Sequence, residues 1–82
     1  MFDNRIKYQI ARLIKFNVLR KTDKTQNLCI MCDKHFNIIV VDLKNKKDYI
    51  KKGYCVMGYY SYYPHTSNLD LECIVEEVFE FV

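Results

Sequence analysis

The sequence contains few residues that break or loosen a chain, with only 2 glycines and 1 proline among 82 residues. It also lacks a long hydrophobic run, because its longest purely aliphatic stretch, Ile38 to Val41, is far shorter than the roughly 20 residues of a membrane helix. Met1 to Arg5 has no apolar run of the signal-peptide kind. These absences argue against disorder, a membrane span and secretion, and they predict a cytoplasmic protein without a membrane partner.

Catalytic motifs are also missing. Phosphate-binding-loop and Ser-His-Asp patterns are absent, and His65 has no carboxylate and nucleophile at a spacing that would fix them beside it. The length allows one domain, residues 1–82, in which about 60% of the unfolded chain's surface becomes buried. We therefore expect a single-domain protein that is not an enzyme and holds no cofactor.

The 4 cysteines include a pair, Cys29 and Cys32, at a spacing known from zinc sites, with His35 three residues further on. The surrounding residues are typical of a strand, however, and residues three apart in a strand point to opposite faces. Without a signal peptide, reduced thiols are also the better expectation than disulfides. The sequence therefore predicts buried free cysteines and no metal.

Charge is divided unevenly along the chain. All 13 Lys and Arg residues lie at or before Lys52, together with five of the 10 acidic residues, so this part carries a net charge of +8. The last 30 residues carry −5, with no Lys or Arg. The two parts could simply pack together and partly cancel. The alternative is a basic face for a polyanion, with an acidic edge kept away from it.

Hydrophobic periodicity predicts strands in the first half. From Arg5 to Val18 apolar residues alternate with polar ones, which favours a long strand bent near Ala11 to Leu13. A helix is the competing interpretation, since Ile6, Ile10 and Ile14 also fit a helical spacing. After an exposed loop at residues 21–26, the segments 28–32 and 37–43 predict a hairpin.

The second half predicts a short helix and two more strands. Asn45 to Gly53 has the composition of a capped helix of two turns. Residues 54–63 are rich in aromatic side chains and predict a strand that leads into an aromatic loop. Residues 71–82 fit either a helix or a strand, and a strand is preferred only because it completes the architecture described next.

This order of elements is that of the OB-fold, so the expected fold is mainly β, a five-stranded OB-fold barrel with a short helix between strands 3 and 4. The second half also resembles the bacterial single-stranded-DNA-binding protein family. The resemblance lies in segments 36–41, 48–53, 53–58 and 71–81. It implies binding of single-stranded DNA and assembly of several barrels into a homo-oligomer.

A site for a single strand needs basic side chains along the phosphates and aromatic rings on which bases stack. The basic candidates lie on the first element, its loop and the hairpin turn, and the aromatic candidates lie at the hairpin and in the tyrosine cluster. They are Lys15, Arg20, Lys21, Lys24 and Lys34, with Phe36, Tyr59, Tyr60, Tyr62 and Tyr63. Tyr60 and Tyr62 lie an even number of residues from Val56, so in a strand they point to the same face as Val56. For these two tyrosines core packing is the competing interpretation.

The function expected is therefore binding of single-stranded DNA, or RNA, in replication or repair, in a low-GC bacterium or a mobile element. One alternative is an accessory subunit that binds a polymerase, primase or helicase through its tyrosines, because tyrosine is favoured at protein interfaces as well. Another is a phage-type inhibitor of a host protein.

Overall fold

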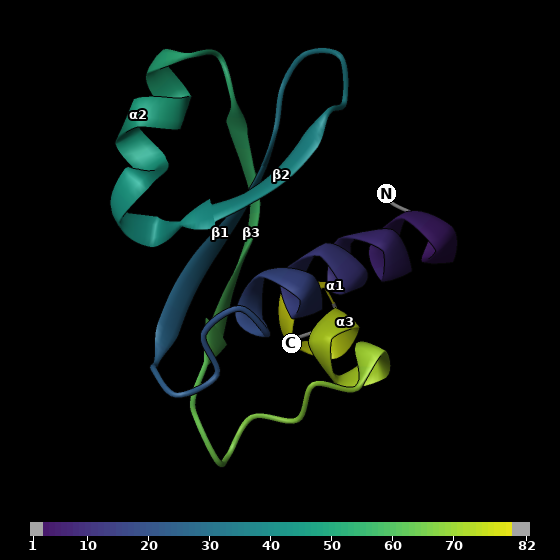
Figure 1. Cartoon of the computed structure of the whole chain (residues 1–82). Helices are drawn as coiled ribbons and strands as arrows, with labels where there is room; N and C mark the ends of the chain where they lie inside the picture. Colours follow the sequence, from purple (N-terminus) through teal and green to yellow (C-terminus); the bar gives the residue numbers. More distant parts are fainter. Residues whose placement is uncertain (1–2, 80–82) are drawn as a thin grey trace.

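The protein is described by a computed structural model that covers residues 3–79. Its elements run in the order helix, strand, strand, helix, strand, helix (Figure 1). They are α1 (Asn4–Val18), β1 (Gln26–Cys32), β2 (Ile38–Asp42), the 3-10 helix η1 (Leu43–Asn45), α2 (Lys46–Lys51), β3 (Cys55–Tyr62) and α3 (Leu71–Phe79).

The three strands form one antiparallel sheet in the order β2-β1-β3. The predicted hairpin is confirmed, with Leu28 opposite Asp42 and Cys32 opposite Ile38. The predicted strand within residues 54–63 is confirmed as β3, which pairs with β1 on its other side. The register of this pairing shifts between Ile30 and Met31 of β1, which lie opposite Gly58 and Val56 of β3. β3 therefore carries a β-bulge in mid-strand.

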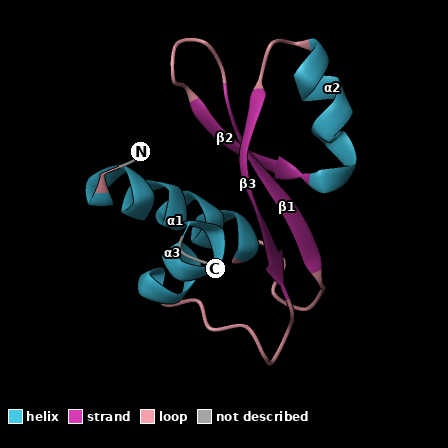
Figure 2. Cartoon of the chain, turned by 180° about the vertical axis from the view of Figure 1, so that it is seen from behind, coloured by secondary structure: helices cyan, strands magenta, loops and turns pink. Residues whose placement is uncertain are grey.

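Helices lie on both faces of the sheet. α1 and α3 lie together on one side, whereas α2 lies apart from them on the other, as the two opposite views show (Figures 1 and 2). The loop between α1 and β1 and the turn between β1 and β2 lie at opposite ends of the sheet (Figure 1). This separation decides which candidate residues can act together.

The core lies between the sheet and the α1–α3 layer. α1 contributes Ile10, Ala11, Ile14 and Val18, α3 contributes Ile74 and Val75, and the sheet contributes Leu28, Ile30, Tyr60 and Tyr62. On the opposite face of the central strand, Cys29 and Met31 are also fully buried. A three-stranded sheet covered on one face by two amphipathic helices thus forms a contiguous core without closing into a barrel.

The prediction of a five-stranded OB-fold barrel is therefore wrong. Residues 4–18 form a helix rather than a strand, and the Asp3 side chain caps it by accepting a hydrogen bond from the Ile6 amide at 3.0 Å. The period-two pattern misled because Phe16, which the strand interpretation placed on one face with Ile14 and Val18, is exposed. The break in the alternation near Ala11 reflects the helical period.

The last segment is also a helix rather than the preferred strand. In α3, Leu71, Ile74, Val75 and Val78 fall at helical spacing, and Ile74 and Val75 are buried against α1 and the sheet. The amide of Ile74 donates to the carbonyl of Asp70 at 3.1 Å, which starts the first turn. Residues 80–82 of the predicted strand lie outside the described part.

The short helix before Gly53 is confirmed, although it starts differently from the prediction. Asn45 makes no capping hydrogen bond, and the Asp42 carboxylate instead accepts from the Lys44 amide at the start of η1. Gly53 ends α2 with a positive φ of 99°, which glycine adopts without steric cost. No helix among residues 3–79 has the length and apolar character needed to cross a bilayer.

Candidate functional site

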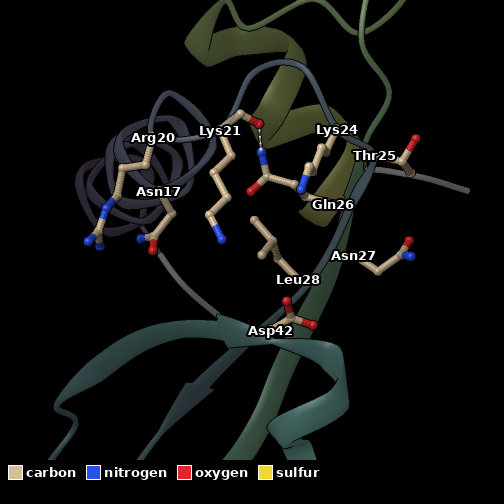
Figure 3. A pocket seen from close by; sticks show the side chains of 9 residues that line it. All are labelled: Asn17, Arg20, Lys21, Lys24, Thr25, Gln26, Asn27, Leu28 and Asp42. Carbon is tan, nitrogen blue, oxygen red and sulfur yellow. Dashed lines mark hydrogen bonds between the residues drawn. The ribbon is translucent and has the colours of Figure 1, made fainter.

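An open hollow lies where the C-terminal end of α1 faces the end of β2. It is open to solvent and has a volume of about 480 Å³. Figure 3 shows its lining, which comes from α1, the loop that follows, β1 and β2. The lining residues are Asn17, Arg20, Lys21, Lys24, Thr25, Gln26, Asn27, Leu28 and Asp42.

Hydrogen bonds hold in place the loop that carries the basic residues of this hollow. The side-chain amide of Gln26 donates to the carbonyl of Val18 and to the carbonyl of Lys21, and Figure 3 shows the second of these bonds. From β3, the hydroxyl of Tyr62 donates to the carbonyl of Thr22 at 2.9 Å. Because these bonds fix the backbone of the loop, only its cationic side chains have to be ordered when a ligand binds.

The electrostatics of the hollow are dominated by three cations. Arg20, Lys21 and Lys24 form no ion pair with any residue of the described part, and the one carboxylate of the lining, Asp42, already accepts from the Lys44 amide. Cations after a helix C-terminus are partly explained by the helix dipole, but that effect fades within the last turn. It does not account for Lys24, six residues beyond the end of α1.

The chemistry offered by the hollow is that of an anion site. Three cationic side chains supply charge, and the side-chain amides of Asn17 and Asn27 each keep an N–H donor, whereas both N–H donors of Gln26 are used by the carbonyls of Val18 and Lys21. Arginine matches two phosphate oxygens at once, and lysine acts as a point charge. The open shape suits a ligand that passes across the surface rather than one that is enclosed.

The structure brings together three of the five predicted basic residues. Arg20, Lys21 and Lys24 line the hollow, whereas Lys15 lies on α1 outside it. Lys34 and Phe36 lie in the turn between β1 and β2, at the far end of the sheet. The Phe36 ring is 80% exposed.

The side chains of β3 point alternately to the two faces of the sheet, and this divides the predicted tyrosine cluster. Tyr60 and Tyr62 point into the core, at 2% and 6% exposure, so no face of either ring is open to a base. Burial raises the pKa of Tyr60 to about 12, and the nearby Glu77 carboxylate adds to the rise. Tyr59 and Tyr63 are exposed.

Tyr59 already has a partner on the sheet face opposite α1 and α3. The Lys46 ammonium group donates to the Tyr59 hydroxyl at 2.6 Å and lies 5.1 Å from the centre of the ring. This hydrogen bond raises the pKa of Lys46. Lys46 therefore competes with any base for Tyr59, and Tyr63, beyond the end of β3, is the more accessible ring.

The cysteines do not form a metal site in the described part of the chain. Cys29, Cys32, Cys55 and Cys73 are all free thiols. Burial raises the pKa of Cys29, which keeps the thiol protonated at neutral pH. Nowhere among residues 3–79 do three side chains of His, Cys, Asp or Glu meet in a way that could hold a metal ion.

Fold and hollow together define a small α/β protein with a three-stranded antiparallel sheet and a basic, open surface site. Comparisons with family models, with curated proteins and with solved structures found no match to this chain. The functional argument therefore depends on the geometry of the hollow.

Sequence reasoning missed Asn17, Gln26 and Asp42 in this hollow. Asp42 had one visible signal, since it is the only polar residue in the run 38–43. Asn17 and Gln26 had none, because only the packing of α1 against the sheet brings residues 17 and 42 to the same place.

Proposed function

We propose that the protein binds a single-stranded nucleic acid, DNA in the first place, with the sugar–phosphate backbone seated in the basic hollow. The observation that carries this proposal is the convergence of Arg20, Lys21 and Lys24 on one open hollow without an ion-pair partner among residues 3–79. Phosphates are the anions that best fit such a set of donors on an open surface. A protein of this kind acts where strands are separated, as in replication or repair.

Exposed aromatic rings support a single strand over a duplex. Tyr63 follows β3 at the end of the sheet where the hollow lies, since its neighbour Tyr62 pairs with Gln26. Its ring is 52% exposed, and the Ser67 hydroxyl oxygen, which accepts from the Tyr63 amide at 2.8 Å, fixes the backbone there. Stacking on such a ring contributes about 1–3 kcal/mol per base and is available only when the base is unpaired.

The test is the affinity for a labelled thymidine oligomer, measured by fluorescence anisotropy over a range of salt concentrations. We expect the double variant Lys21→Glu, Lys24→Glu to bind much more weakly than the parent. Each lost phosphate contact lowers the slope of log affinity against log salt by about 0.7, so two contacts lower it by about 1.4. Duplex DNA of equal length should bind less tightly than the single strand.

The matched control is Arg5→Glu with Arg12→Glu. It changes the net charge by the same amount, and both residues are exposed on α1 away from the hollow. This control should keep most of the affinity. Equal losses in the two double variants would show that net charge alone drives binding, and the hollow would not be the site.

A further inference from the structure

Two cysteines of the sheet lie directly opposite each other. Cys32, at the end of β1, is paired with Cys55, at the start of β3, and both are free thiols. Opposite residues of an antiparallel pair point their side chains to the same face, with their Cα atoms about 4.5 or 5.5 Å apart. Both spacings lie within the range of about 4.4–6.8 Å that is usual for a disulfide. The two strands therefore already hold these cysteines at the spacing that a bond between their sulfur atoms needs.

The β-bulge of β3 is what sets Cys55 opposite Cys32. On one side of the bulge Ile30 pairs with Gly58. Continued without a shift, this register would set Cys32 opposite Val56, and Cys55 would point to the other face of the sheet. The bulge moves the pairing by one position, and the two thiols come to lie on the same face.

Both thiols are accessible to a small molecule in solution. The prediction that the cysteines are buried is wrong for Cys55, which is exposed, and Cys32 is half-buried. The pair lies at the end of the sheet with the turn between β1 and β2, away from the hollow (Figure 1). It is also the last pair between β1 and β3, so the strand ends can adjust without disturbing the pairs before it.

Neither of the other two cysteines has such a partner in the described part of the chain. Cys29 is fully buried, and it points to the opposite face from Cys32, three residues further along the same strand. Cys73 belongs to α3 and lies near Tyr60, five residues along β3 from Cys55. The fold therefore selects one pair from the four thiols.

We propose that Cys32 and Cys55 form a dithiol site that is oxidised reversibly by low-molecular-weight disulfides such as oxidised glutathione. The thiolate of Cys55, the exposed residue, attacks one sulfur of the oxidant, whose S–S bond breaks, and one glutathione leaves as a thiolate. The thiolate of Cys32 then attacks the Cys55 sulfur of this mixed disulfide, and the second glutathione leaves. The two protons released by the cysteines are taken up by the two glutathione thiolates. The protein thus loses two electrons and the oxidant gains them.

The second step is intramolecular and therefore fast. The register holds Cys32 beside Cys55, which gives its thiol a high effective concentration at the mixed disulfide. The closed bond joins β1 to β3 and encloses residues 33–54, which include β2, η1 and α2. Because a cross-link restricts the unfolded chain, the oxidised protein unfolds at a higher temperature than the reduced one.

The test is treatment of the folded full chain with oxidised glutathione, followed by acid quenching and intact mass spectrometry. We expect the parent to lose the mass of two hydrogen atoms. Of its 4 cysteines, two should still react with a maleimide after unfolding. Peptide mapping should place the bond between Cys32 and Cys55, and dithiothreitol should restore all the thiols.

Three serine variants separate the steps. Cys32→Ser should accumulate one glutathione on Cys55, because the thiol that resolves the mixed disulfide is missing. Cys55→Ser should form no internal bond. Cys73→Ser is the matched control, since it removes another half-buried thiol, and it should form the bond as the parent does. Oxidation should raise the thermal unfolding midpoint of the parent and of Cys73→Ser, and of neither other variant.

The same treatment in urea tests whether the fold selects the pair. Without the register of β1 and β3, the four thiols should give several pairings, whereas the folded chain gives one. The same single bond in the unfolded chain would contradict the role of the register. A folded parent that carries glutathione without an internal bond would overturn the proposal. So would disulfide-linked dimers, or a bond that involves Cys29 or Cys73.

Discussion

Tyr60 and Tyr62, two core tyrosines of β3, differ in whether the hydroxyl group forms a hydrogen bond. The Tyr62 hydroxyl donates to the carbonyl of Thr22 and fixes the loop that carries the basic residues. The Tyr60 hydroxyl is buried and forms no hydrogen bond of ordinary length and angle among the described residues, although the Ser67 hydroxyl lies near enough to lower its pKa. A buried polar group without a partner costs stability, whereas a satisfied one contributes to it. The same chemical group therefore has opposite effects two residues apart.

Replacement of each tyrosine by phenylalanine separates these effects. We expect Tyr60→Phe to raise the free energy of unfolding by about 1 kcal/mol, because it removes an unpaired buried hydroxyl. Tyr62→Phe should lower it by about 1 kcal/mol, because the Thr22 carbonyl loses its donor. Urea unfolding of both variants measures the difference. A loss of stability in Tyr60→Phe would mean that its hydroxyl has a partner after all.

At the scale of elements, α1 shows how two periods can compete in one segment. Ile14 and Phe16 share a face in a strand but lie about 160° apart around a helix. In the structure Ile14 is fully buried and Phe16 is mostly exposed. The alternation from Ile6 to Val18 is therefore a by-product of a helix that has apolar residues on two sides, one for the core and one left open.

Alanine substitutions distinguish the two interpretations. Ile14→Ala should destabilise the protein by about 2–5 kcal/mol, as expected for a fully buried side chain. Phe16→Ala should change the stability by no more than about 0.5 kcal/mol. Thermal unfolding followed by circular dichroism measures both. Similar losses from the two substitutions would contradict the orientation of α1.

At the scale of the whole molecule, the fold depends on how closely α3 approaches the sheet. Gly58 of β3 leaves room for the Val78 side chain of α3, since an added Cβ would be 3.0 Å from Val78 Cγ1. This contact joins the acidic C-terminal helix to a strand edge and keeps the carboxylates of α3 on the opposite side of the sheet from α2. Because α3 also packs beside α1, its carboxylates lie in the same layer as the basic residues of α1, and the two oppositely charged parts of the chain meet there.

A double-mutant cycle tests this close approach. Gly58→Ala alone should destabilise the protein by about 1 kcal/mol, because Val78 has to shift. In a Val78→Ala background the same substitution should be neutral or stabilising, since alanine is favoured over glycine inside a strand by about 0.5–1 kcal/mol. Chemical denaturation of the four proteins gives the coupling energy. An equal cost of Gly58→Ala in both backgrounds would rule out the contact.

The sequence by itself determined the local features that depend on neighbouring residues. These are the β1–β2 hairpin, the strand β3, the short helix that ends at Gly53 and the loop that carries Lys21 and Lys24. Turn residues, β-branched runs and a helix-ending glycine act over a few positions, so they can be interpreted without the rest of the chain.

Only the tertiary structure decided the state of residues 4–18 and 71–79, because each segment has apolar residues that fit two periods and burial selects one of them. It also decided which basic residues meet. Lys34 is ten residues from Lys24 in sequence but lies at the other end of the sheet, whereas Asp42 joins Arg20 in the hollow. Strand pairing and helix packing fix these distances, and no short-range pattern encodes them.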